Sequence, residues 1–132
     1  MATSLLFTGS AFASLVNVTV TTANQTILAS DATYDRRIYG ISQTQLGSTT
    51  ASTPTIFLNN GTTNFSIGLG PSTTATANTT TDIFGNSTLA PVFQKQKDAN
   101  GVPYFNLPSG WSITVTQANT SVNYLIFGEK YN

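Results

Sequence analysis

The chain has 132 residues, of which five are basic and five acidic, so its formal net charge is zero, and it contains neither histidine nor cysteine. Ser, Thr, Asn and Gln make up 55 of the 132 residues, a composition that is often found in disordered chains. Disorder is excluded because the chain has no net charge and contains eight Phe, five Tyr and one Trp. We therefore predict one domain over residues 1–132 with its own core. Because the charges balance, the chain has no electrostatic attraction for nucleic acid or an anionic membrane, and neither is expected as a partner. The absence of histidine and cysteine excludes the common nucleophilic catalysts and zinc sites. We therefore expect no enzyme and no cofactor.

The N-terminal segment, residues 1–14, is apolar without a strand or helix period. It carries Leu5, Leu6, Phe7 and Phe12. A large apolar side chain gains about 1.5–3 kcal/mol when fully buried, which offsets much of the entropy cost of ordering the segment. We therefore predict that these four side chains contact a neighbouring subunit or another protein. The alternative, which the sequence leaves open, is that the segment packs on its own domain.

Neither a signal peptide nor a membrane span is expected. An Ala-x-Ala pattern ends at Ala13, as in secretory signals, but no Lys or Arg precedes Leu5 and residues 8–10 interrupt the apolar stretch. A transmembrane helix needs about 20 consecutive apolar residues, and no window of the chain provides them.

Alternation of apolar and polar residues predicts the strands, because successive side chains of a strand point to opposite faces. In residues 15–22, Val16, Val18 and Val20 share one face, which predicts a half-buried strand. The other predicted strands, in chain order, are Thr26–Ala29, Arg36–Gln45, Thr55–Leu58, Phe65–Leu69, Val102–Leu107, Trp111–Thr116 and Val122–Phe127. Val122–Phe127 is apolar on both faces, which is typical of a central or interface strand.

Turn residues punctuate these strands. Asn60-Gly61 lies between Thr55–Leu58 and Phe65–Leu69 and predicts a hairpin, because Asn and Gly accept the positive φ angles of tight turns. Residues 71–88 contain only Ile83 and Phe84 as large apolar side chains, which predicts a long polar surface loop.

No window of the sequence shows a helical period with caps, and Thr, Val and Ile are abundant where a helix would use Ala, Leu and Glu. The chain is therefore predicted to be all-β. We expect a single antiparallel β-sandwich, jelly-roll or immunoglobulin-like, or a small barrel, of about six to eight short strands.

Carboxylates are the remaining candidates for catalysis or metal binding. Asp31 and Asp35 are close enough in sequence to suggest a glycoside-hydrolase pair, but Asp-Ala-Thr-Tyr-Asp is typical of a turn with side-chain-to-backbone hydrogen bonds. Residues 98–101, Asp-Ala-Asn-Gly, resemble the start of a calcium loop but lack its later acidic ligands, which favours a hairpin turn. Asp82, Asp98 and Glu129 are not expected to converge. We therefore predict no catalytic and no metal site.

Aromatic side chains are candidates for stacking on sugars. Those considered are Tyr34, Tyr39, Tyr104, Trp111 and Tyr131. Because Trp111 alternates with Ile113 and Val115, the core is favoured over a binding platform for this side chain.

Four segments carry a resemblance to a known family: RRIYGISQT, TIFLNNGTTNFSIG, KDANGVPYFNLPSGWSITVTQ and YLIFGEKYN. Across residues 36–131 they resemble small virion structural proteins of tailed bacteriophages, most of all capsid decoration (cement) proteins. The resemblance implies a non-enzymatic protein on the capsid surface that binds the major capsid protein lattice as a symmetric homo-oligomer, a trimer, and stabilises it. It carries over no functional residue, because such proteins act by surface complementarity.

A second hypothesis, from another class, is a receptor- or carbohydrate-binding module of a phage fibre or tail. It would use exposed tyrosines and the loop at residues 71–88.

Overall fold

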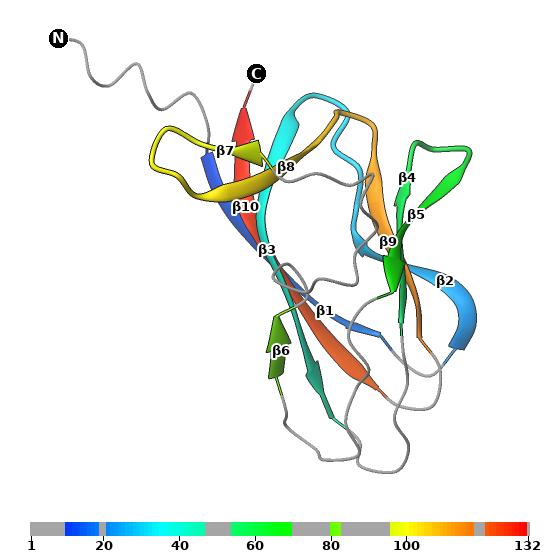
Figure 1. Ribbon diagram of the computed structural model, residues 1–132. Coiled ribbons are helices and arrows are strands. Elements are labelled where there is room, and N and C mark those ends of the chain that lie inside the picture. Colours follow the sequence, from blue (N-terminus) through cyan, green and yellow to red (C-terminus); the bar gives the residue numbers. More distant parts are fainter. Residues whose placement is uncertain are drawn as a thin grey trace, which may run out of the picture.

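Two antiparallel sheets face each other in a computed structural model that describes residues 10–18, 21–46, 54–69, 80–82, 96–117 and 121–131 (Figure 1). The described residues form no helix. The strands are β1 (Ser10–Val18), β2 (Thr21–Leu28), β3 (Asp35–Gln45), β4 (Thr55–Asn59), β5 (Asn64–Leu69), β6 (Thr80–Asp82), β7 (Gln96–Lys97), β8 (Pro103–Leu107), β9 (Ser112–Gln117) and β10 (Val122–Tyr131). The prediction of an all-β sandwich is confirmed.

The strands pair in a nested order. One sheet runs β1-β10-β3-β8-β7, with β6 also paired to β3, and the other runs β2-β9-β4-β5. Thus β1 pairs with β10, β2 with β9, β3 with β8 and β4 with β5, and successive pairs alternate between the two sheets. This is the strand order of a jelly roll, one of the two sandwich topologies that the sequence left open.

Some strand boundaries differ from the prediction. The alternating segment 15–22 is divided between two strands, because β1 ends at Val18 and β2 begins at Thr21. The first strand begins at Ser10 rather than Leu15. The two strands beyond the predicted six to eight are β6 and β7, of three and two residues, which pair through their backbones without an apolar pattern. β6 lies inside the expected polar loop; residues 71–79 and 83–88 of that loop lie outside the described residues.

The core lies between the sheets and is built from buried apolar residues of both. It comprises Val18, Ile27, Leu28, Ile38, Ile41, Ile56, Phe105, Leu107, Ile113, Val115, Val122, Tyr124 and Ile126. Strand β10 lies between β1 and β3, so of the two alternatives predicted for this segment, a central or an interface strand, the structure shows a central strand.

One buried cation joins the sheets at the end of the core. Arg36, on β3, is 3% exposed, and its guanidinium donates to the carbonyl oxygens of Ala29 and Trp111, both at 2.8 Å. Ala29 follows β2 and Trp111 precedes β9, so a side chain of one sheet is bonded to two strand ends of the other.

Turn chemistry follows the predicted pattern. In the β4–β5 hairpin, Gly61 has a φ of 99°, and the side chain of Asn60 accepts from the N–H groups of Thr62 and Thr63 at 2.9 and 2.8 Å. In the turn between β7 and β8, Gly101 has a φ of 81°. The hairpin predicted at Asn60-Gly61 is confirmed.

Candidate functional site

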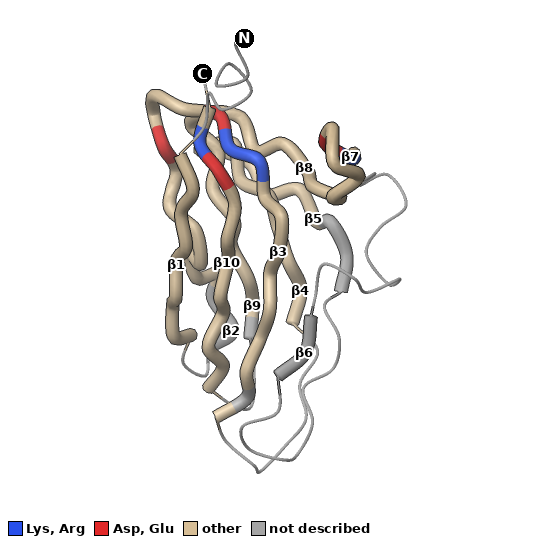
Figure 2. Tube along the Cα trace, turned by 90° about the vertical axis from the view of Figure 1, so that its left-hand side faces the viewer, with Lys and Arg blue, Asp and Glu red and all other residues tan. Residues whose placement is uncertain are grey.

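The charged residues whose side chains the structure describes gather at one end of the sandwich (Figure 2). This end is where β3 begins and β10 finishes, and the β7–β8 hairpin lies beside it. The charged residues with described side chains are Asp31, Asp35, Arg36, Arg37, Lys97, Asp98, Glu129 and Lys130. Away from this end, the described surface presents neutral polar and apolar groups.

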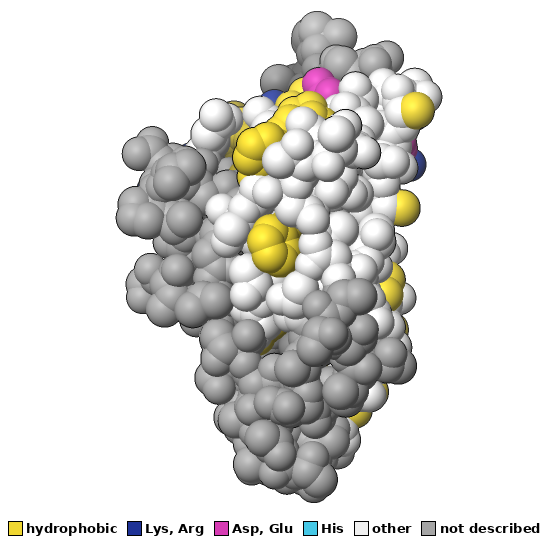
Figure 3. Space-filling view, turned by 90° about the vertical axis from the view of Figure 1, so that its right-hand side faces the viewer, with side chains coloured by type: hydrophobic (Ala, Val, Ile, Leu, Met, Phe, Trp, Pro, Cys, Tyr) yellow, Lys and Arg dark blue, Asp and Glu magenta, His cyan; other side chains and the backbone are white. Residues whose placement is uncertain are grey.

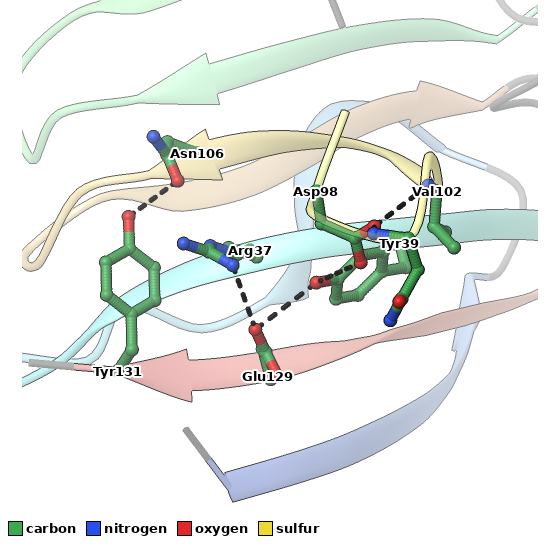
Figure 4. A network of polar contacts seen from close by, with 8 residues as sticks. Arg37, Tyr39, Asp98, Val102, Asn106, Glu129 and Tyr131 are labelled. Carbon is green, nitrogen blue, oxygen red and sulfur yellow. Dashed lines mark hydrogen bonds and ion pairs between the residues drawn. The ribbon is translucent and has the colours of Figure 1, made fainter. Parts of the chain in front are cut away.

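A cleft of about 390 Å³ opens at the charged end (Figure 4). Arg37 and Tyr39 enter it from β3, Glu129 from β10, and Asp98 and Val102 from the turn between β7 and β8. Ala99 and Asn100 complete the lining. Three segments that are far apart in sequence therefore supply its polar groups.

The Tyr39 hydroxyl lies between two carboxylates. Its oxygen is 3.3 Å from Asp98 Oδ2 and 3.2 Å from Glu129 Oε1, and one hydroxyl proton can be donated to only one of them at a time. Burial raises the pKa of Tyr39 above its ordinary value, so the hydroxyl remains a donor at neutral pH. Arg37 Nη1 is 3.4 Å from the same Glu129 oxygen. These contacts are long for hydrogen bonds, so Arg37 and Tyr39 can donate, and the two carboxylates can accept, in shorter bonds to a ligand.

The framework around these groups is held more tightly. The Arg37 guanidinium lies over the rings of Tyr104 and Tyr131, at 4.8 and 4.9 Å from their centres, and Tyr131 Oη is 2.6 Å from Asn106 Oδ1. Asp98 Oδ1 accepts from two backbone N–H groups of its own turn, at 2.8 and 2.9 Å, and these bonds lower the pKa of Asp98. The cleft thus presents acceptors and donors at fixed positions, an arrangement that suits a ligand carrying several hydroxyl groups.

The structure corrects one expectation about the acidic residues. Asp98 and Glu129 were not expected to converge, yet both contact the Tyr39 hydroxyl. Their segments meet because β3 lies between β10 and β8, a long-range pairing that no local sequence pattern reveals. The described residues contain no group of three or more acidic, His or Cys side chains that could hold a metal ion.

Asp31 and Asp35 do not form a pair of free carboxylates. Asp31 Oδ1 accepts from the N–H groups of Thr33 and Tyr34 at 2.9 and 3.0 Å, while Oδ2 lies 2.9 Å from Lys130 Nζ. Asp35 Oδ1 accepts from the backbone N–H of Ser109 at 2.8 Å. The turn interpretation of this segment is confirmed.

The aromatic candidates have different environments. Trp111 is partly buried: it packs against the core on one side and stacks on the exposed Phe65, with ring centres 5.6 Å apart and planes 20° apart. Tyr39, Tyr104 and Tyr131 lie in or beside the cleft, whereas Tyr34 is exposed near Lys130. On the face of the second sheet, Figure 3 shows separate hydrophobic side chains within a largely polar surface.

The outer face of the first sheet carries a more continuous apolar surface. Leu15 on β1 lies directly opposite Leu125 on β10, and Ala13 lies opposite Phe127. The exposed fractions of Leu15, Leu125 and Phe127 are 68, 39 and 45%. We call these four residues the apolar strip.

The predicted N-terminal interface is only partly within the described chain. Leu5, Leu6 and Phe7 lie outside the described residues. Phe12 lies on β1, is half-buried, and packs against the core of its own domain.

Comparisons with protein-family models, with curated proteins and with solved structures found no match to this chain. The described residues include no helix long and apolar enough to cross a membrane.

Proposed function

We propose that this protein is a non-enzymatic structural component of a tailed-phage virion, which binds the major capsid protein lattice on the capsid surface and stabilises it. The observation that carries the proposal is the apolar strip of Ala13, Leu15, Leu125 and Phe127, which lies on two strands joined by nine consecutive residue pairs. Contiguous exposed apolar side chains are typical of protein-binding surfaces. The sequence resemblance to capsid decoration proteins supplies the partner, and it implies attachment as a homo-oligomer, a trimer.

The fold is compatible with this role. Jelly rolls occur in viral capsid proteins as well as in lectins, so the topology supports the proposal by analogy alone. A flank almost without charge suits attachment by apolar contact, which depends little on ionic strength.

The test is reattachment to particles that lack the protein. Wild-type protein should co-sediment with such particles and raise their melting temperature. Phe127→Ser should weaken binding at least tenfold, because about 1.4 kcal/mol of lost apolar burial is a factor of ten. Leu46→Ser, which changes an exposed apolar residue outside the strip, is the matched control and should bind normally. Wild-type protein that stays in the supernatant and leaves capsid melting unchanged would remove the proposal.

A second candidate function, a receptor- or carbohydrate-binding module of a fibre or tail, is favoured by the cleft. A sugar hydroxyl can donate to Asp98 or Glu129 while it accepts from Arg37 or Tyr39, and the long contacts among these groups leave room for it. A glycan array with the isolated protein tests this function. Specific binding that Tyr39→Phe weakens would favour it over capsid decoration, and an array without signal would exclude it for the glycans displayed.

A further inference from the structure

Strand β1 ends the first sheet and is paired on one side only. Its nine residues match β10 from Ser10–Lys130 to Val18–Val122 without a register shift, and no described strand pairs with its other side. An edge strand of this kind presents a row of backbone N–H and C=O groups that can pair with another chain.

The other edge strands have features that prevent pairing with another chain, and β1 lacks these features. β7 is two residues long and contains Lys97, and the pairings of β5 and β2 with their neighbours are interrupted by register shifts. Short length, charge and bulges are the devices by which proteins prevent pairing at an edge. β1, with the sequence SAFASLVNV, has no charge, no proline and no bulge.

The side chains of β1 are incompletely covered on both faces. On the outer face, Leu15 is the most exposed large hydrophobic residue of the described chain. On the inner face, Phe12 and Val16 pack against the core but remain partly exposed, and β1 is the last strand of their sheet. A further strand beside β1 would cover side chains on both faces.

We propose that β1 pairs antiparallel with β1 of a second copy of this chain, about a two-fold axis at Ser14, so that one sheet runs through both copies. An antiparallel edge is complementary to itself under a two-fold rotation, and neither the uncharged strand nor the zero net charge opposes the approach of a second copy.

The register follows from two requirements. Inner side chains must remain inner, so each residue pairs with one of the same face, and all nine residues overlap only when Ser14 lies opposite Ser14 of the partner subunit. Leu15 then lies opposite the partner's Ala13, and Phe12 lies opposite the partner's Val16. This interface gives a structure to the homo-oligomer of the proposed function, but it is inferred only from the edge of the sheet. The pairing produces a dimer, whereas the sequence resemblance implies a trimer.

The first test measures molar mass by light scattering across a concentration series. We expect the wild-type protein to be a dimer. The dimer of Leu15→Lys should have a dissociation constant at least tenfold higher, because its two lysines would lie diagonally across the two-fold axis and repel each other. Leu125→Lys changes the same strip one strand away from the edge, and this control should remain dimeric. A wild-type monomer or trimer, a dimeric Leu15→Lys, or an equally dissociated Leu125→Lys would each overturn the proposal.

The second test uses the absence of cysteine from the chain. A thiol in Ser14→Cys would face its own copy at the Cα spacing of about 4.5–5.5 Å that disulfides accept, so mild oxidation should yield a covalent dimer. In Asn17→Cys the two thiols would be about 20 Å apart along the strands, so this control should stay uncrosslinked. The reverse result would refute the register. Wild-type protein that binds particles but is monomeric would refute the interface alone, whereas a wild-type dimer that fails to bind particles would refute the proposed function alone.

Discussion

Arg36 provides the most direct test of how the two sheets are held together. Replacing it by Met keeps an unbranched apolar stem but removes the guanidinium, and with it both bonds to the carbonyl oxygens of Ala29 and Trp111. A hydrogen bond from a charged donor contributes about 1.5–3 kcal/mol, so the gross loss is about 3–6 kcal/mol. Part of this is regained, because burial already lowers the pKa of Arg36 and its Nε has no hydrogen-bond partner in the described chain. We expect a net loss of about 2–4 kcal/mol.

This loss corresponds to a fall in melting temperature of about 8–16 °C for a domain of this size. Urea unfolding at fixed protein concentration and calorimetry measure it. Arg37→Met is the matched control, since the neighbouring arginine is one-third exposed, and its ring contacts and 3.4 Å ion pair predict about 1 kcal/mol. If Arg36→Met loses no more free energy of unfolding than Arg37→Met, Arg36 does not link the sheets as argued.

Three further predictions concern stability. Lys130 and two backbone N–H groups lower the pKa of Asp31, so its ionised form contributes stability that is lost as the pH falls below the ordinary value of 3.8. In Asp31→Asn the midpoint of urea unfolding should therefore depend less on pH between about pH 5 and pH 2, and an unchanged pH dependence would contradict this. A Cβ atom on Gly128 would collide with the backbone carbonyl of Arg37, so Gly128→Ala should cost about 1–3 kcal/mol in thermal unfolding, and wild-type melting would count against the close approach. Burial raises the pKa of Tyr124, so stability should fall as the pH rises past 10.0, where unfolded tyrosine ionises; Tyr124→Phe should make that fall shallower, and an equal slope would argue against burial as its cause.

Local patterns sufficed for much of the secondary structure. Val16 and Val18 share the inner face as their alternation indicated, Ile113 and Val115 are buried together, and Asn60-Gly61 turns the chain. These features depend on neighbours within a few residues, where a period of two and a positive φ leave a direct signature in the sequence.

The N-terminal part of β1 lacked such a signature. Ala11 and Ala13 point outward and Phe12 inward, but alanine gives little contrast with serine, so the sequence of the N-terminal segment shows no strand period here. Its partner β10 lies at the other end of the sequence. Only that pairing makes these residues a strand, and no local pattern can report it.

The cleft was not predictable for the same reason. Asp98 and Glu129 meet at Tyr39 because β3 separates β8 from β10 at a particular register. A shift of two residues in either pairing would preserve every alternation pattern and move the carboxylates apart. Strand order and register are properties of the assembled sheets, whereas periodicity is a property of each strand alone.

The nested strand order has a consequence for how the chain folds. The β4–β5 hairpin joins residues that are close in sequence, but each enclosing pair closes a longer loop, and the outermost joins Ser10 to Lys130. The entropy cost of closing a loop is incurred before the stabilising contacts across it have formed, so folding slows as contacts become less local. Sandwiches with such long-range pairing fold in milliseconds to seconds. Before β1 arrives, β10 is an apolar strand with an open side. In that interval β10 can capture β1 of another chain, so refolding at high concentration is expected to favour strand exchange or aggregation, and dilution should favour the correct product.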